Sequence, residues 1–323
     1  MKKLLEVLLG LVLMVVLMGA GGLAWATTRV NRTLSRQITT HAVGFPIPFP
    51  LPADEIARLE SDGVDPERVA LDRAVERGRH LVEARYACVE CHGRDFGGGV
   101  MVDDPLIGRL LGPNITEGQG SRSLGFEPSD WDRVVRHGLR SDGTPALMPS
   151  EDFQGMSDQE LSDIVAYLRS QPPVDNSVPP LKWGPLGRVL LATGQIPLSA
   201  DVIPSHAAAH EVYPPEAAVS VEFGRHMAGI CMGCHQADFS GGKIPGAPPD
   251  WPAAANLTPH TDGLAEWSYP DFVRALREGR RPDGTAVRAP MSDMSPYAAN
   301  MTDTELDALW MYLRSLPAKP SGR

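Results

Sequence analysis

The chain begins with a long apolar segment. Residues 7–28 contain no charged side chain, and Leu, Val and Met dominate the first part of this stretch. It is long enough to cross a bilayer as a helix. It also fits a cleaved signal peptide, with an apolar centre at residues 7–18 and small cleavage-site residues at 24–26. We prefer the uncleaved anchor, and both alternatives predict that the following chain is exported.

Two later segments have the apolar spacing of amphipathic helices. Ser157 and Glu160 open the first as a capping box, and Thr302 and Glu305 open the second. Apolar residues then recur three and four positions apart and fall on one helix face. They are Leu161, Ile164, Val165 and Leu168 in the first segment and Leu306, Leu309, Trp310 and Leu313 in the second. The pattern predicts two similar closing helices.

These closing helices belong to a longer internal repeat. The matched segments are Gly78-Arg79-His80 with Gly224-Arg225-His226, Asn114-Ile115-Thr116 with Asn256-Leu257-Thr258, Asp130-Trp131 with Asp271-Phe272, and Asp142-Gly143-Thr144 with Asp283-Gly284-Thr285. Earlier helices are expected at 73–87 and 217–230, and at 129–138 and 269–279, where a Gly ends each of the last two. Duplication therefore supports two domains.

The repeat predicts the domain organisation. The first domain is expected at residues 70–172 and the second at 217–319. Residues 1–30 form the anchor or signal, and 31–69 an extended linker. Residues 173–216 are rich in Pro, show little helical periodicity, and predict an extended strap between the domains.

Composition limits the function classes. Hydrophobic residues make up 42% and charged residues 22% of the 323 residues, which is ordinary for a globular chain. The formal net charge of −10 argues against nucleic acid, which is bound mainly through Lys and Arg. An acidic surface favours a basic protein partner.

The four cysteines form two copies of the pattern Cys-x-x-Cys-His. The first copy holds Cys88, Cys91 and His92, and the second holds Cys231, Cys234 and His235. In this pattern both thiols form thioethers with a haem, and the adjacent His becomes the proximal iron ligand. A redox dithiol and half of a zinc site are the alternatives. Two copies that use every cysteine behind an export signal favour two covalently bound haem c groups.

Around these motifs each half resembles a class I cytochrome c domain, over about residues 70–172 and 217–317. The resemblance implies an all-α fold of two tandem domains behind an N-terminal transmembrane helix. It also implies a second axial iron ligand, a Met in the loop before the last helix. Met148 holds that place in the first half. In the second half Met291 is preferred, because Pro290-Met291 resembles the ligand loop of cytochrome subunits of membrane alcohol dehydrogenases, and Met294 is the alternative.

Met ligation suggests what the chain does. A thioether ligand raises the potential of a haem, and a six-coordinate iron does not readily bind substrate. We therefore expect an electron carrier, not an enzyme, that passes single electrons from a membrane-associated donor to a periplasmic or membrane acceptor. The resemblance to the cytochrome subunits of alcohol and gluconate dehydrogenase complexes points to a dehydrogenase or a quinol-oxidising complex as partner. Those subunits usually carry three haem motifs and a C-terminal anchor, whereas this chain has two motifs and an N-terminal apolar segment.

An enzyme and a different set of iron ligands are the less favoured alternatives. A diheme cytochrome c peroxidase would need an iron with an open side, but both halves offer a Met. His80 and His226 are paired in the repeat and could be alternative ligands, although surface or packing roles are preferred. Glu278 stands opposite His137, which disfavours a shared scheme of two His ligands. Asn114 and Asn256 could contact haem propionates or form Asx turns.

Overall fold

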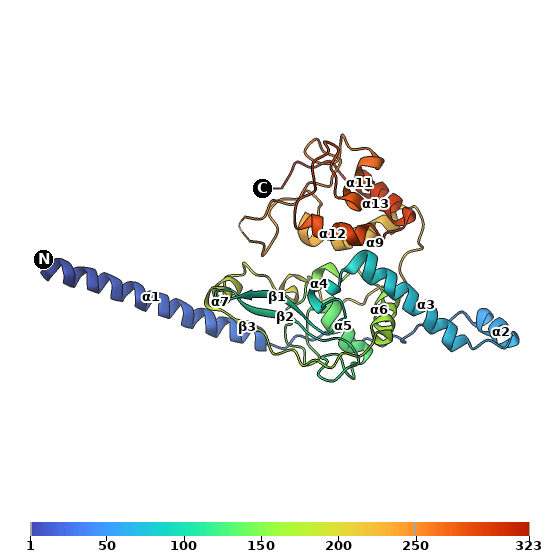
Figure 1. Cartoon of the computed structure of the whole chain (residues 1–323), viewed down its shortest axis with the longest axis horizontal. Helices are drawn as coiled ribbons and strands as arrows, with labels where there is room; N and C mark the ends of the chain where they lie inside the picture. The colour runs from blue at the N-terminus through green and yellow to red at the C-terminus, as the bar shows by residue number, and fades with distance from the viewer. Residues whose placement is uncertain (1, 249, 323) are drawn as a thin grey trace.

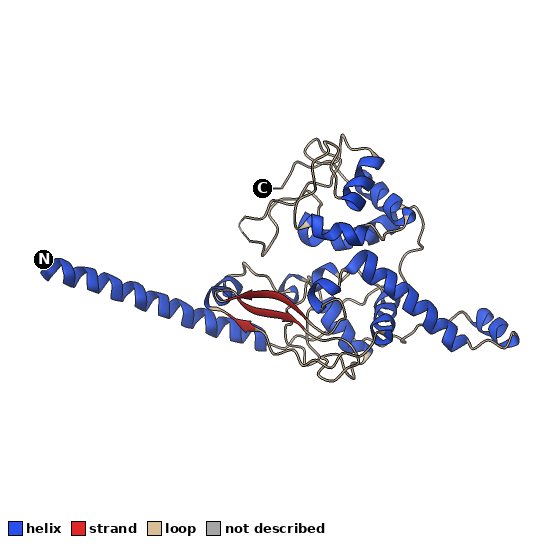
Figure 2. Cartoon of the chain, viewed as in Figure 1, coloured by secondary structure: helices blue, strands red, loops and turns tan. Residues whose placement is uncertain are grey.

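The computed structural model describes residues 2–248 and 250–322 as two helical units stacked against each other, with one long helix projecting from the first (Figure 1). The elements of the first part are α1 (Lys2–Ser35), α2 (Ala53–Ser61), α3 (Pro66–Leu81), η1 (Val82–Tyr86), α4 (Val89–His92), β1 (Gly99–Asp104), β2 (Gly108–Gly112), α5 (Pro128–His137), η2 (Ser150–Asp152) and α6 (Asp158–Ser170). The connector and the second part contain β3 (Lys182–Trp183), α7 (Pro185–Ala192), α8 (Ser199–Val202), α9 (Val221–Ala228), η3 (Gly229–Cys231), α10 (Met232–His235), α11 (Tyr269–Glu278), α12 (Met291–Ala298) and α13 (Asp303–Ser315). Helices dominate, as the sequence predicts (Figure 2).

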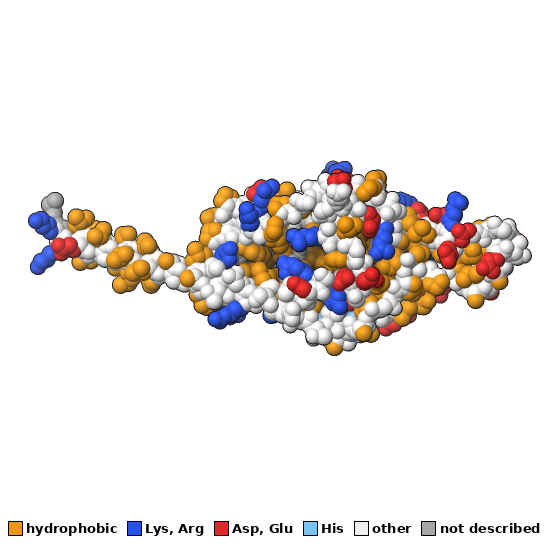
Figure 3. Space-filling view, turned by 90° about the horizontal axis from the view of Figure 1, so that it is seen from below, with side chains coloured by type: hydrophobic (Ala, Val, Ile, Leu, Met, Phe, Trp, Pro, Cys, Tyr) orange, Lys and Arg blue, Asp and Glu red, His pale blue; other side chains and the backbone are white. Residues whose placement is uncertain are grey.

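Helix α1 is long and apolar enough to cross a membrane. Its large apolar side chains between Leu4 and Met18 are exposed, and Figure 3 shows them covering the projecting helix with charged side chains at its tip. Ala26 and Val30, near the other end, are buried against α7. The apolar helix therefore runs without interruption into the packed part of the molecule.

One helix crossing organises each unit. In the first, α3 packs on α6, and in the second, α9 packs on α13. The paired glycines of the repeat lie at these crossings. A Cβ on Gly78 would lie 2.0 Å from the carbonyl oxygen of Asp163, and one on Gly224 would lie 2.0 Å from that of Ala308. Only glycine lets the helix backbones approach this closely.

The helix ends follow the sequence pattern. Ser157 with Glu160 and Thr302 with Glu305 form reciprocal capping boxes at the starts of α6 and α13. Helices α5 and α11 each end at a glycine in the left-handed conformation. The helices predicted at 129–138 and 269–279 and the two closing helices are therefore confirmed.

Two separate cores hold the units together. The first lies between α3, η1, α5 and α6 and includes Tyr86, Trp131 and Leu161. The second lies between α9, α11 and α13 and includes Phe223, Phe272 and Leu306. Trp131 and Phe272, which match each other in the repeat, are therefore core aromatics.

The surroundings of the first unit differ from the prediction. Strands β1, β2 and β3 form an antiparallel sheet, in which β3 of the connector pairs with β2. The connector is not simply extended, because it also forms α7 and α8. The linker at 31–69 likewise holds the end of α1, all of α2 and the start of α3. Strand β3 and helix α7 are short, and they are stabilised by pairing with β2 and by packing against α1 rather than by their own periodicity.

Candidate haem-binding centres

Each Cys-x-x-Cys-His motif forms a single helical turn. The backbone N–H of His92 donates to the carbonyl of Cys88, 3.0 Å away, so these side chains lie one turn apart on α4. Cys231 precedes α10 in the same way, and His235 is the last residue of that helix. The first thiol and the imidazole of each motif are thus set on one side of a short helix, as attachment to a single haem requires.

The two motif histidines are held in the same orientation. Nδ1 of His92 lies 2.9 Å from the carbonyl oxygen of Pro113, and Nδ1 of His235 lies 2.7 Å from that of Ala255. A carbonyl oxygen can only accept, so each Nδ1 carries the proton and each Nε2 keeps a free lone pair. Burial lowers the pKa of both imidazoles and keeps them neutral. Neutral, oriented imidazoles suit iron ligands.

The cysteines also fit haem attachment. None of the four forms a disulfide. Burial raises the pKa of Cys88 and of Cys231 to about 12, so neither is a thiolate at neutral pH. Reactive dithiols and zinc ligands need the thiolate form. A neutral thioether has no such charge to stabilise, and the buried positions suit it.

The methionines differ between the halves. Met148 packs against the first core, as Cys88 does. Met291 and Met294 both lie on α12, three positions apart, and α12 packs against α11 and, in the other unit, against η1. The second core includes Cys231 among its neighbours but neither of these methionines. Met148 stays the predicted ligand of the first centre, and Met291 the preferred ligand of the second, with Met294 as the alternative.

The paired asparagines are used by the protein itself. Oδ1 of Asn114 accepts from the backbone and hydroxyl of Thr116, and Oδ1 of Asn256 accepts in the same way from Thr258. Their Nδ2 groups donate to the chain beyond the closing helices, at Val174 and Lys319. These are Asx turns that fasten the tail of each unit over its loop, which favours the loop-stabilising alternative.

Comparison with known proteins decides the family. The family described as "Cytochrome C oxidase, cbb3-type, subunit III" matches residues 73–168, and the family described as "Cytochrome c" matches residues 224–317. The chain carries two cytochrome c domains. The two domains, each with one Cys-x-x-Cys-His motif, hold two covalently bound haem c groups.

Curated relatives agree with this assignment. The alcohol dehydrogenase (quinone) cytochrome c subunit of Gluconobacter oxydans is 29% identical over 77% of this chain and 56% of its own length. The gluconate 2-dehydrogenase cytochrome c subunit of Pantoea cypripedii is 30% identical over 79% and 62%. A diheme cytochrome c-type protein of Cereibacter sphaeroides is 25% identical over 79% and 90%. The chain thus spans about six-tenths of the first two relatives, and the peroxidase alternative finds no support among these three.

The cytochrome domains contact each other through matched residues. Nε2 of His80 lies 3.0 Å from both carboxylate oxygens of Glu305, and Nε2 of His226 lies 2.8 Å from Oε1 of Glu160. Arg85 also binds Glu160, at 2.8 Å. His80 matches His226 in the repeat and Glu160 matches Glu305, so the two contacts are related by the duplication. The paired histidines lie at the interface between the domains, which fits the packing role that the sequence favours over iron ligation.

Charge stabilises these contacts. Burial alone would raise the pKa of Glu160, but the hydrogen bond from His226 and the charge of Arg85 hold it at about 2. The hydrogen bond to Glu305 raises the pKa of His80. Sequence reasoning missed this pairing because both glutamates were already assigned as capping residues. Each carboxylate does both tasks, since Glu160 also accepts from Ser157 and Glu305 from Thr302.

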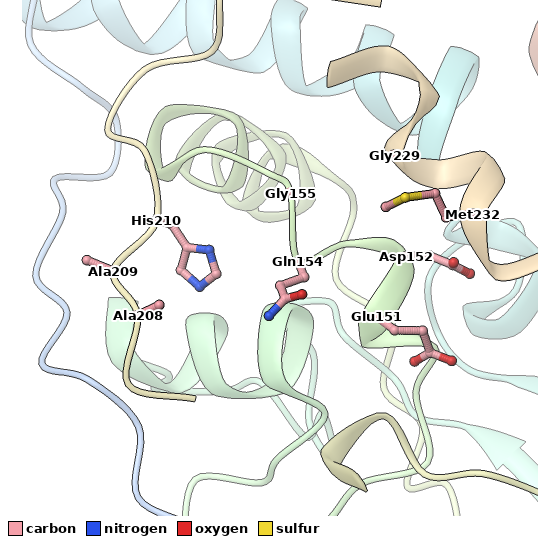
Figure 4. Close-up of a pocket in the computed structure, with 9 residues that line it drawn as sticks. All are labelled: Glu151, Asp152, Gln154, Gly155, Ala208, Ala209, His210, Gly229 and Met232. Atoms are coloured by element: carbon pink, nitrogen blue, oxygen red, sulfur yellow. The ribbon is translucent and has the colours of Figure 1, made fainter. Parts of the chain in front are cut away.

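Each predicted methionine segment lies against the haem-binding motif of the other domain. After Met148, η2 packs on η3 and α10, and a Cβ on Gly233 would lie 2.2 Å from Asp152. From the second domain, Tyr297 of α12 donates to Glu90, which lies within the first motif. Between the domains is a cleft of about 300 Å³, and its lining includes Asp152, Met232 and His210 (Figure 4).

Proposed function

We propose that this chain is the membrane-tethered cytochrome of a dehydrogenase system, which accepts electrons from a membrane-associated partner and passes them to an exported or membrane acceptor. In this proposal Cys88, Cys91, His92 and Met148 hold the first haem, and Cys231, Cys234, His235 and Met291 hold the second. The iron of each haem supplies the one-electron chemistry when bound.

The contact between the two domains carries the proposal. Helix α12 of the second domain packs on η1, directly before the first motif, and η2 of the first domain packs on the second motif. The matched pairs His80–Glu305 and His226–Glu160 hold this arrangement from both sides. Packing of each motif against the opposite domain suits electron exchange within one molecule.

The residues around each motif fix the orientation of its histidine, which suits electron transfer. The carbonyls of Pro113 and Ala255 fix the tautomer of His92 and His235, so neither ring has to reorient. The Met148 segment packs on the first core, and in this proposal Met148 closes the second axial side of that centre. A closed centre with two fixed ligands favours transfer of single electrons over binding of a substrate.

The surroundings fit a position at a membrane. Helix α1 could span a bilayer, and its buried end leads directly into the first domain. We propose the bacterial cytoplasmic membrane, with both haem domains on the periplasmic side. The dehydrogenase partner is proposed because two similar proteins are cytochrome c subunits of an alcohol dehydrogenase and of a gluconate 2-dehydrogenase.

Substrate-dependent reduction of the haems tests the proposal. Membranes that contain this chain are made anaerobic, and ethanol, gluconate or a quinol is added while the haem c absorption is followed. A matched preparation lacking the chain is the control. Reduction by a dehydrogenase substrate supports the dehydrogenase partner. Reduction by the quinol alone would replace it with a quinol-oxidising partner, and no reduction by any donor would contradict the proposed route.

A further inference from the structure

Four histidines and one aspartate gather outside the haem-binding motifs, on the first domain. His41 follows α1, Asp132 and His137 lie on α5, and His206 and His210 belong to the connector. His41, Asp132, His137 and His210 each offer one ligand atom, and these atoms lie within 4.8 Å of one another. Segments far apart in the sequence therefore bring nitrogen and oxygen donors to one point.

Hydrogen bonds set the protonation of the central histidine. Nε2 of His206 donates to the carbonyl of Ala200, 3.2 Å away, so its Nδ1 is an acceptor. Nδ1 of His137 lies 3.0 Å from that Nδ1 and must carry the shared proton. Nε2 of His137 therefore keeps its lone pair, directed at Nε2 of His210 and at Oδ2 of Asp132. This is the usual way a partner behind the ring orients a metal-binding histidine.

Two buried polar atoms of the cluster have no hydrogen-bond partner among the described residues. They are Oδ2 of Asp132 and Nδ1 of His41. The side chains of Asp132 and His137 are fully buried. Buried polar atoms nearly always find a partner, so two such atoms in one cluster call for a ligand.

The spacing suits a tetrahedral ion. Ligands bound at 2.0–2.1 Å in tetrahedral geometry lie roughly 3.4 Å apart. Nε2 of His137 is 3.3 Å from Nε2 of His210 and 3.4 Å from Oδ2 of Asp132. The ring centroid of His41 lies 5.4 Å from that of His137 and 5.2 Å from that of His210. Since the four ligand atoms all lie within 4.8 Å of one another, an inward movement around an ion would complete the set.

The guanidinium of Arg136 limits which oxygen of Asp132 is available to a metal ion. Nε of Arg136 donates to Oδ1 of Asp132 at 2.8 Å, which leaves Oδ2 as the available oxygen. The charge of Arg136 is shared with Asp158, 2.7 Å away, so it is partly balanced outside the cluster. The guanidinium also fixes the Asp132 carboxylate, as hydrogen-bonded carboxylate ligands require.

We propose that His41, Asp132, His137 and His210 bind a divalent transition-metal ion, with zinc the best match, and that His206 orients His137. Imidazole nitrogen and carboxylate oxygen are both ligands that zinc accepts, and four such ligands with no open position match the four-coordinate geometry of a structural zinc site. The haem fold does not need this site, because the second domain has Val273 and Glu278 where the first has Asp132 and His137. The ion would link three segments of the chain. They are the segment that follows α1, helix α5 of the first domain, and the connector.

Metal analysis of the full-length holoprotein in detergent tests this proposal. After chelator treatment and dialysis, zinc is added back and its content is measured beside the haem iron. We expect one zinc per two irons. His41→Ala and His210→Ala should each weaken zinc binding by at least about 100-fold, beyond the cost of altering a partner behind a ligand. Because neither side chain is fully buried, both variants are expected to fold.

His260→Ala is the matched control, since His260 lies in the second domain beside Asp262. It should bind zinc like the wild type. An unchanged haem spectrum in all three variants shows that they are folded. Failure of the wild type to take up one equivalent, or equal uptake by the wild type and a His41→Ala/His210→Ala double variant, would contradict the site and leave a hydrogen-bonded histidine cluster.

Discussion

The two cytochrome domains share their haem-binding core and differ in what surrounds it. Both have a glycine at the main helix crossing, a capping box on the closing helix, and a motif histidine bound to a backbone carbonyl. Around the first domain the structure adds a three-stranded sheet, α7 and the end of α1. The residues for helix packing, hydrogen bonding and haem attachment are therefore alike in the two domains, whereas the contact with α1 and the histidine cluster are features of the first domain.

Removing a motif histidine should have the largest effect. His92→Ala is expected to remove proper ligation of the first haem and leave about half of the low-spin haem signal, because the second centre has its own ligands. His235→Ala should remove proper ligation of the second haem and leave the signal of the first. Haem content and electron paramagnetic resonance measure both. Loss of both signals in either variant would show that the two domains do not bind haem independently.

Replacing a predicted methionine ligand should have the next largest effect, a lower reduction potential of the haem in that half. Met148→Ala should lower one potential by on the order of 0.1 V or more, within the roughly 0.8 V range that axial ligands set. In the second half Met291→Ala should have the same effect and Met294→Ala should not. Redox titration of each variant provides the measurement. If only Met294→Ala lowers a potential, Met294 and not Met291 is the ligand of the second haem.

The glycines at the helix crossings offer a matched pair. Gly78→Ala and Gly224→Ala should each destabilise one domain by about 1–3 kcal/mol, because the added Cβ overlaps a carbonyl of the opposing helix. Gly155→Ala is the control, since no atom lies within 4 Å of a Cβ there. Thermal unfolding followed by circular dichroism compares them. Equal stability of all three variants would contradict the close crossing.

The domain interface should respond to pH, with the smallest effect. The raised pKa of His80 makes its contribution complete below about pH 6.5 and lost as pH rises through the raised value. The lowered pKa of Glu160 makes its contribution complete above about pH 4.5 and lost as pH falls toward 2. We expect the tightest contact between these limits.

Small-angle X-ray scattering at pH 5.5 and pH 8 measures this effect. The radius of gyration should increase slightly at the higher pH, and Glu305→Gln should abolish most of the difference. The effect is small because such partly exposed pairs contribute at most about 1 kcal/mol. If the radius of gyration of the wild type does not change with pH, contacts other than these ion pairs hold the two domains together.

Local signals explain what the sequence predicts well. The haem motifs, the capping boxes at Ser157 and Thr302, and the glycines that end α5 and α11 each depend on a few neighbouring residues. The apolar periodicity of α6 and α13 is equally local. These features repeat in the two halves, and the repetition strengthens each of them.

Long-range pairing explains what the sequence does not predict. Strand β3 joins β2 across some 70 residues of chain, and His80 meets Glu305 across 225. The histidine cluster needs three separate segments, and the repeat alone marked His137 as unmatched without showing its neighbours. Such contacts depend on how the units pack, which periodicity and spacing do not encode.

Optical redox titration of the purified holoprotein, followed by carbon monoxide added to the reduced form, tests the central claim of two closed electron-carrying centres most directly. The account predicts two low-spin haems that titrate at high potential and do not bind the gas. A haem that titrates at low potential and binds carbon monoxide readily would contradict it, because that iron would lack its methionine ligand.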